Sequence, residues 1–187
     1  MPAAQPPDVA TATRILVYGV TGSGKSTAAQ RIAARRGLPC HLADELTWEP
    51  GWTPVPTDEQ RRRFAEIAAT DLWVLDTAYS SWLDLVLPRV QLVVGLDYPR
   101  WFSFQRLVRR TIARIIDKRP ICNGNVETVR SALAKDSILR WHFSSFARKR
   151  DRMRQWCRDQ VGTPVLLFER SRDLDRWIDR LPPASPS

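Results

Sequence analysis

The sequence G-V-T-G-S-G-K-S at positions 19–26 is the most informative part of this 187-residue chain. It matches the pattern G-x-x-x-x-G-K-[S/T] without exception. The short apolar run R-I-L-V-Y at 14–18 comes before it, and a helical pattern at 26–36 that stops at Gly37 comes after it. A strand, a glycine-rich loop and a helix in this order surround phosphate oxygens with backbone N–H groups. A glycine-rich turn with a chance lysine is the alternative, and the flanking strand and helix disfavour it.

The loop suits a purine nucleoside triphosphate with magnesium. Its glycines let the backbone turn inward, and the helix that starts near Ser26 adds unpaired N–H groups and a dipole. We expect Lys25 to reach the β- and γ-phosphates and the Ser26 hydroxyl to coordinate Mg²⁺, so ATP and Mg²⁺ are the predicted cofactors. The predicted nucleotide-binding residues are Gly19, Thr21, Gly22, Ser23, Gly24, Lys25, Ser26 and Thr27.

Apolar runs and helical patterns alternate along the rest of the chain. Further strands are predicted at 38–43, 73–77, 92–97 and 165–168. Five strand–helix alternations predict an α/β protein with a three-layer P-loop NTPase fold, a parallel five-stranded sheet with helices on both faces. Helices are expected from Thr57, Pro99 and about Ser137, and a last one contains Leu174 and Leu181.

Two helices carry more detailed predictions. Thr57 and Gln60 have the spacing of a capping box at the start of a helix. In the helix after Pro99, an apolar stripe is expected on one face. Its members are Trp101, Gln105, Val108, Ile112 and Ile115.

Composition limits the class of protein. One domain is expected at 14–181, with mobile tails at 1–13 and 182–187, which are rich in Pro, Ala and Ser. No apolar run approaches the roughly 18–20 residues of a membrane span, so we expect no membrane partner, and the few scattered cysteines favour a cytoplasmic protein. The net charge of +9 favours anionic partners, either nucleotides or nucleic acid. The cysteines, Cys40, Cys122 and Cys157, fit neither a zinc site nor a disulfide framework and are expected to be reduced.

Three aspartates stand at the ends of predicted strands, and the carboxyl ends of parallel strands meet at one edge of a sheet. Asp44 is predicted to position or deprotonate an acceptor hydroxyl, with a magnesium ligand or a surface acid as alternatives. Asp76 is predicted to hold Mg²⁺ together with Ser26, with a turn-capping role as the alternative. For Asp97 we predict a cap of the helix that follows it.

Basic residues gather on two helical segments. Arg106, Arg110 and Arg114 repeat every four residues and share one helix face. We predict that they are catalytic and stabilise charge on the transferring phosphoryl group, with a solvated basic face as the alternative. The run R-K-R-D-R-M-R at 148–154 is predicted to face solvent, and contact with nucleic acid is its alternative.

Aromatic and histidine side chains give weaker signals. Trp48 and Trp52 follow Asp44 in a Pro- and Gly-rich stretch, where they would either stack on an acceptor ring or pack the loop against the core. His41 and His142 are predicted to be structural, because no cluster of partner residues is visible around them in the sequence.

Several strings resemble the P-loop family of topology modulation proteins, which are similar to adenylate kinases and other small nucleotide kinases. They extend over nearly the whole folded region, and the string at 44–52 is the most specific. The strings are G-V-T-G-S-G-K-S-T at 19–27, D-E-L-T-W-E-P-G-W at 44–52, W-V-L-D-T-A-Y at 73–79, L-D-Y-P-R-W at 96–101, N-G-N at 123–125 and L-R-W at 139–141.

The resemblance implies an adenylate-kinase-like core, an acceptor-binding segment at about 44–70 and an arginine-bearing lid at about 106–130. Relatives commonly read D-G-N-Y after the third strand, where this chain has D-T-A-Y at 76–79, which adds side chains beside the acceptor site. The family name implies an effect on DNA topology, but the sequence contains no DNA-reading motif.

The sequence therefore predicts a kinase that transfers the γ-phosphoryl group of ATP–Mg²⁺ to a nucleotide or another small hydroxyl- or phosphate-bearing acceptor. Lys25 and the loop amides would hold the donor phosphates. The alternative is a nucleotide-dependent regulatory or DNA-associated P-loop NTPase that hydrolyses ATP slowly, which the basic composition favours.

Overall fold

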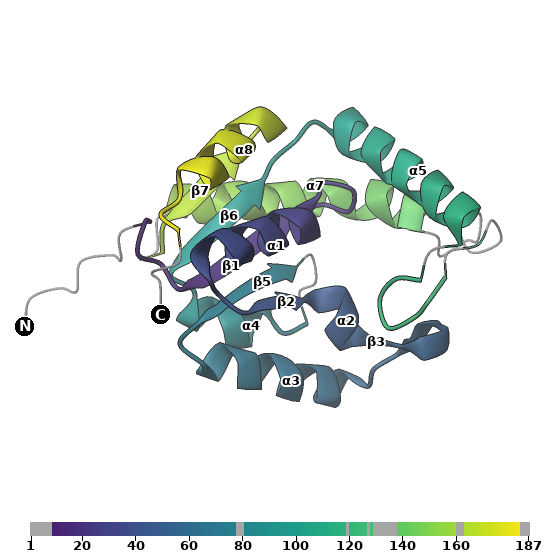
Figure 1. Cartoon of the computed structure of the whole chain (residues 1–187), viewed down its shortest axis with the longest axis horizontal. Helices are drawn as coiled ribbons and strands as arrows, with labels where there is room; N and C mark the ends of the chain where they lie inside the picture. The colour runs from purple at the N-terminus through teal and green to yellow at the C-terminus, as the bar shows by residue number, and fades with distance from the viewer. Residues whose placement is uncertain are drawn as a thin grey trace, which may run out of the picture.

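The computed structural model describes residues 9–77, 81–118, 120–126, 128, 138–159 and 163–183. Its centre is a five-stranded parallel sheet in the order β2-β5-β1-β6-β7, with helices on both faces (Figure 1). The two short strands β3 and β4 form a separate antiparallel pair. The predicted three-layer α/β fold with a five-stranded parallel sheet is confirmed.

The elements lie close to their predicted positions. The strands of the main sheet are β1 (Arg14–Gly19), β2 (Cys40–Leu42), β5 (Trp73–Thr77), β6 (Leu92–Leu96) and β7 (Val165–Phe168). The longer helices are α1 (Lys25–Arg36), α3 (Thr57–Ala69), α5 (Arg100–Asp117), α7 (Ile138–Asp159) and α8 (Ser171–Arg180). Shorter elements are α2 (Ala43–Thr47), β3 (Trp48–Glu49), η1 (Pro50–Trp52), β4 (Thr53–Pro54), α4 (Leu83–Val86) and η2 (Leu87–Arg89).

The core consists of two hydrophobic clusters, one on each face of the sheet. In β1, Ile15 and Val17 belong to the cluster that contains residues of α1 and α8. Leu16 and Tyr18 belong to the cluster that contains residues of α3, α4 and α7. Because both faces are covered, the strands are continuous apolar runs, and this made them recognisable in the sequence.

Packing begins before residue 14. Ala12 is fully buried in the first cluster, and Val9 packs against it. The guanidinium of Arg36 donates hydrogen bonds to the carbonyl oxygens of Ala10 and Ala12. The last residues of the predicted N-terminal tail therefore contribute to the fold.

The predicted capping box of α3 is wrong. Pro56 is the N-cap and Thr57 is already the first helical residue, and no described side chain caps this end. The Gln60 side chain instead donates a hydrogen bond of 2.8 Å to the carbonyl oxygen of Val55. The chain enters α3 from a proline in extended conformation, so the Thr57 hydroxyl lies one residue too late to cap the helix.

The apolar stripe predicted for α5 is not the buried face of this helix. Trp101 and Ile112 are 67% and 52% exposed, whereas Ser103, Leu107 and Thr111 are buried. The helix packs against the backbone of the loop that follows β1, and the backbone of Ser103 and the side chain of Leu107 face Gly22 there. The apolar periodicity therefore marks a face that the described residues leave exposed.

Candidate functional site

The loop between β1 and α1 has the geometry of a phosphate cradle. Gly22 and Gly24 have φ angles of 81° and 90°, a left-handed conformation that favours glycine. Gly24 is the N-cap of α1, and no described side chain caps this helix end. The first N–H groups of α1 therefore lack acceptors within the helix and can bind an anion.

A hydrogen bond joins the loop helix to the end of β5. The Ser26 hydroxyl donates to Oδ2 of Asp76 at 2.5 Å, and Oδ1 of the same carboxylate accepts the backbone N–H of Ala43 at 2.7 Å. Asp76 is only 2% exposed. Burial raises the pKa of Asp76, and the nearby Lys25 charge opposes that rise. The structure thus brings together Ser26 and Asp76, the two residues predicted to hold the metal.

The oxygens at this position suit magnesium. Ser26 and Asp76 supply a hydroxyl and a carboxylate, the hard ligands that Mg²⁺ prefers. In the part of the chain that the structure describes, no cluster of three or more His, Cys, Asp or Glu residues could hold a metal by itself. A magnesium ion here would therefore keep water molecules and take its remaining ligands from nucleotide phosphates, as this ion commonly does.

Helix α5 lies directly against the loop. A Cβ atom on Gly22 would come within 2.3 Å of the Ser103 carbonyl oxygen, and one on Gly24 within 2.8 Å of the Arg106 Nη2 atom. The Arg106 guanidinium also lies 5.6 Å from the ring centre of Phe102. The predicted arginine Arg106 is therefore beside the cradle. This contact was not foreseen, because nothing in the sequence relates positions 22–24 to α5.

The other two predicted arginines lie further along the same helix. Burial raises the pKa of the Cys122 thiol to about 12, and the charges of Asp44 and Glu45 act in the same direction. The charge of Arg114 lowers this pKa, so Arg114 lies near Cys122. Arg110 lies one helical turn from each of its neighbours in the row. The row thus extends from the phosphate loop toward the turn at 121–125.

Helix α7 supports the loop from the other side. His142 is fully buried, and its Nδ1 atom lies 2.9 Å from the carbonyl oxygen of Thr21. Burial lowers the pKa of His142, which favours the neutral ring with its proton on Nδ1. The imidazole therefore fixes the orientation of one peptide of the cradle. The prediction of a structural histidine did not include this contact with the phosphate loop.

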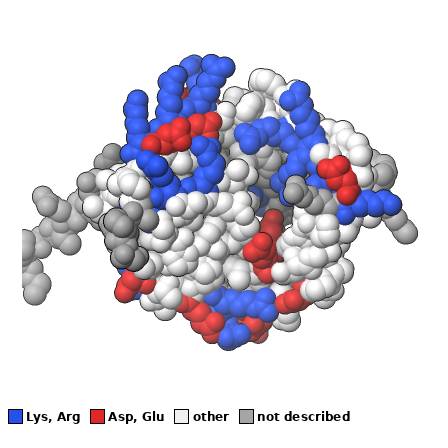
Figure 2. All heavy atoms as spheres, in the orientation of Figure 1, with Lys and Arg blue, Asp and Glu red and all other residues white. Residues whose placement is uncertain are grey.

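The segment after β2 forms the opposite side of the site. Asp44 and Glu45 lie in the first turn of α2 and are exposed. Figure 2 shows that this face of the molecule is hollowed between α1 and α2, with acidic side chains over α2 below the hollow and basic side chains above it. The negative charge of Asp44 also raises the pKa of the buried Asp76, so Asp44 lies near the proposed metal ligands.

The turn at 121–125 holds this segment in place. The Cys122 Sγ atom donates to the Asp44 carbonyl oxygen at 2.9 Å. The Asn123 amide donates to the carbonyl oxygens of Glu45 and Trp48 at 2.9 and 2.7 Å. The N-G-N string signalled a turn in the sequence, but its partners could not be predicted.

The same turn also fixes the two tryptophans. Asn125 donates through its amide to the Glu49 carbonyl oxygen at 3.0 Å and accepts the Trp52 N–H at 2.7 Å. The rings of Trp48 and Trp52 meet edge to face, with centroids 5.9 Å apart. These contacts favour the packing role of the two rings, and stacking on an acceptor stays a prediction.

The prediction that Asp97 caps α5 is wrong. Asp97 is 2% exposed and accepts hydrogen bonds from the Nε atoms of Arg150 and Arg154 at 2.6 and 2.8 Å. Pro99 is the N-cap of α5, and no side chain among the described residues caps that end. The basic run at 148–154 therefore does not simply face solvent, because two of its arginines pair with a buried carboxylate and Lys149 is buried.

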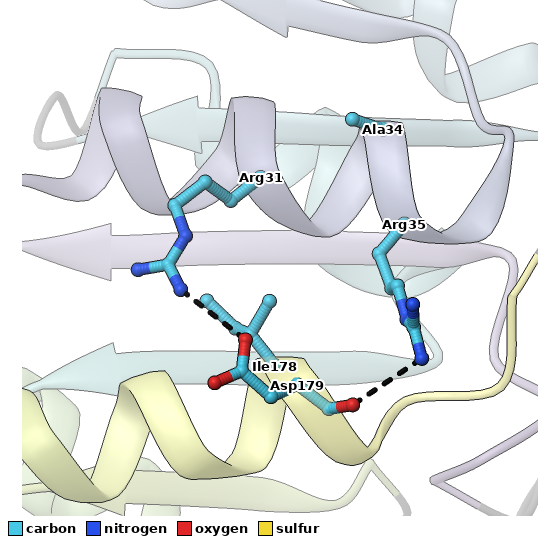
Figure 3. Close-up of a pocket in the computed structure, with 5 residues that line it drawn as sticks. All are labelled: Arg31, Ala34, Arg35, Ile178 and Asp179. Atoms are coloured by element: carbon cyan, nitrogen blue, oxygen red, sulfur yellow. Dashed lines mark hydrogen bonds and ion pairs between the residues drawn. The ribbon is translucent and has the colours of Figure 1, made fainter.

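A groove between α1 and α8 is separate from this site. It is lined by Arg31, Ala34, Arg35, Ile178 and Asp179, and Figure 3 shows Arg31 and Arg35 directed toward Asp179. Nη2 of Arg31 lies 3.6 Å from Oδ1 of Asp179, and Arg35 donates to the Asp179 carbonyl oxygen at 3.3 Å. These contacts join two helices, so the groove is explained by packing.

Some predicted features lie outside the described residues. They include Ala78 and Tyr79 of the D-T-A-Y string and parts of the predicted lid between 119 and 137.

No helix in the described ranges is long and apolar enough to span a membrane. The three cysteines are unpaired thiols, and burial raises the pKa of Cys40 to about 11, which keeps that thiol protonated at neutral pH.

The chain matches no family model, and no curated protein is similar to it in sequence. Its structure is similar to a gluconokinase from Sinorhizobium meliloti 1021, with 19% identity, a TM-score of 0.52, and coverage of 90% of this chain and 93% of the other. It is also similar to a shikimate kinase from Bacteroides thetaiotaomicron, with 15% identity, a TM-score of 0.51, and coverage of 91% and 97%. At these identities the likeness shows the fold, and the chain has the three-layer α/β fold of P-loop NTPases.

Proposed function

We propose that this protein is a P-loop phosphotransferase that moves the γ-phosphoryl group of ATP–Mg²⁺ to a small-molecule acceptor. The single observation that carries the proposal is the hydrogen bond between Ser26 and Asp76 beside the glycine loop. A hydroxyl and a carboxylate at this place are the protein ligands of magnesium in P-loop enzymes.

Each predicted residue has a role in this proposal. Lys25 and the N–H groups around Gly22 and Gly24 bind the donor phosphates, and Ser26 with Asp76 holds magnesium. The metal neutralises charge on the β- and γ-phosphates when it is bound. Arg106, beside Gly24, supplies a cation where charge moves during transfer. Asp44, across the hollow, positions or deprotonates the acceptor hydroxyl.

The small-molecule acceptor is supported by two features. The hollow beside the phosphate loop is bounded by α2 and its acidic first turn, which gives room for a second substrate next to the first (Figure 2). Both structural neighbours are named as kinases of small molecules. A nucleotide acceptor, as in adenylate kinases, and membership of the topology modulation family stay predictions.

The DNA-associated alternative is less well supported. It rested on the basic composition and in part on the run at 148–154. Arg150 and Arg154 of that run are paired with Asp97, and Lys149 is 4% exposed, so the run is not a row of free surface cations. A salt-dependent interaction with DNA needs accessible cations.

The test is a screen of small hydroxyl compounds and nucleotides with ATP and Mg²⁺, with detection of the phosphorylated product. We expect stoichiometric phosphorylation of one acceptor class by the wild type and none by Lys25→Ala. The control is Lys118→Ala, which removes an exposed lysine at the end of α5. ATP hydrolysis that needs no acceptor and is stimulated by DNA would instead support the alternative.

A further inference from the structure

Helix α7 carries two kinds of cation. Arg150 and Arg154 pair with the carboxylate of Asp97. Lys149 directly precedes Arg150 in sequence, yet it is 4% exposed and no carboxylate of the described residues is within ion-pair distance of it. A buried ammonium group without a counter-ion is costly, so it is seldom kept without a function.

The surroundings of Lys149 locate it at the proposed site. Helix α7 contacts β1 and passes behind it in Figure 1. The Nζ atom of Lys149 lies 5.3 Å from the ring centre of Trp141. Burial lowers the pKa of Lys149 to about 7, and the charges that act on it include Lys25 of the phosphate loop and Asp44 of the acceptor side. Lys149 is therefore within electrostatic range of both sides of the site.

Two further cations lie near Lys149 on α7, of which Arg148 is exposed and Arg152 is half-buried. Arg148 and Arg152 also act on Lys149, and neither lies within ion-pair distance of a carboxylate in the described ranges. Arg152 lies beside the hydroxyl of Tyr18. Burial raises the pKa of Tyr18, and the charge of Arg152 opposes that rise. Tyr18 is in β1 and directly precedes Gly19, the first residue of the phosphate loop. Three cations and a phenol thus gather near the loop. None of the three cations pairs with a carboxylate of the described residues, although the charge of Asp44 acts on Lys149.

We propose that Lys149, with Arg148 and Arg152, forms an anion subsite for the acceptor, so that the acceptor carries a carboxylate or phosphate besides the hydroxyl that receives the phosphoryl group. This inference rests on the proposed function. The donor phosphates already have the loop N–H groups, Lys25 and Arg106. An acceptor anion would provide the missing partner of the buried ammonium group and hold the acceptor hydroxyl near Asp44.

A kinetic experiment tests the subsite with matched acceptors. Glucose, gluconate and glucose 6-phosphate share one skeleton and differ in charge, as do adenosine and AMP. We expect the acidic members of a set to be phosphorylated in preference to the neutral one, and the preferred acid shows whether the anion is a carboxylate or a phosphate. Lys149→Met should raise the acceptor KM by roughly ten- to a hundredfold, the effect of losing a charged hydrogen bond, with little change in the ATP KM.

The control variant is Arg158→Met, which removes an exposed cation from the last turn of α7 and should change neither KM. Lys149→Arg should restore part of the acceptor affinity if charge is what matters. Preference for the neutral compounds, or a rise in the ATP KM in place of the acceptor KM, would overturn the proposal.

A binding experiment separates the subsite from the kinase activity. The chain has four lysines, Lys25, Lys118, Lys135 and Lys149, so the lysine side-chain signals are resolvable by NMR and assignable with Lys149→Met. In protein saturated with the β,γ-imido analogue of ATP and Mg²⁺, added inorganic phosphate or gluconate should raise the pKa of Lys149 by about one unit or more. A raised pKa without phosphorylation of any acceptor would refute only the kinase. A pKa that neither probe changes would refute the subsite.

Discussion

The Ser26 hydroxyl lies 2.5 Å from Oδ2 of Asp76, and the other oxygen of that carboxylate accepts the N–H of Ala43. This arrangement connects the first turn of α1, the end of β5 and the start of α2. The three elements therefore meet at a carboxylate that is buried and only partly occupied by protein donors, which is a suitable position for a magnesium ligand.

Replacing Asp76 with Asn should weaken the dependence of turnover on Mg²⁺ and slow turnover. ATP binding without metal should stay near the wild-type value, because a carboxylate holds magnesium directly or through water and an amide does so poorly. Magnesium titrations of activity and of nucleotide binding measure the two effects. Asp58→Asn, an exposed change in the first turn of α3, is the control. An unchanged titration would make Asp76 a structural residue that orients Ser26 and Ala43.

Replacing Arg106 with Ala should lower kcat by at least about a hundredfold with little change in ATP affinity. The guanidinium lies beside Gly24, where it would meet charge that moves during phosphoryl transfer. Arg110→Ala and Arg114→Ala should also lower kcat if α5 moves toward the nucleotide. Arg109→Ala is the matched control, since Arg109 is exposed on the same helix. Steady-state kinetics of the four variants measures this, and normal turnover in all of them would contradict the predicted lid.

Replacing Gly22 with Ala should destabilise the protein more than replacing Gly124 with Ala. Both glycines have similar positive φ angles, 81° and 82°, so each substitution carries about 1–2 kcal/mol of backbone strain. At Gly22 the new Cβ also meets the Ser103 carbonyl oxygen at 2.3 Å, whereas at Gly124 nothing lies within 4 Å. The clash should add roughly 1–3 kcal/mol. Urea unfolding of the two variants compares them, and equal losses would mean that α5 does not press on the loop.

The sequence predicted best those features that depend on neighbouring residues. The glycine loop and the strands ending at Thr77 and Phe168 are specified locally, by turn residues and apolar runs, and their positions followed directly. Asp97 was misread because its partners, Arg150 and Arg154, lie on a helix more than fifty positions away. The buried face of α5 could not be predicted for a similar reason, because contact with Gly22 and not hydrophobic periodicity determines which residues are covered.

Replacing Lys149 with Met should stabilise the protein near neutral pH and remove a pH-dependent part of its stability. The pKa of Lys149 is lowered from 10.5 to about 7 by burial, with Lys25, Arg148 and Arg152 acting in the same direction and Asp44 against it. Between pH 7 and 10.5 the unfolded chain therefore binds more protons at this residue than the folded chain. The free energy of unfolding then rises with pH over that window, by on the order of 2–3 kcal/mol between pH 7.5 and 9.5.

Urea unfolding of the wild type and of Lys149→Met at these two pH values measures the effect. The wild type should gain stability relative to the variant as the pH rises, because only the wild type carries the unpaired ammonium group. Other groups that titrate in this range are common to both proteins, so the difference between their slopes reports Lys149 alone. Parallel slopes would mean that Lys149 has a partner that keeps it protonated in the folded protein. Destabilisation by Met that is equal at both pH values would make it a packing residue. If the free energy of unfolding rises more steeply with pH in the wild type than in Lys149→Met, the chain keeps a destabilising buried charge at this site, as binding sites often do.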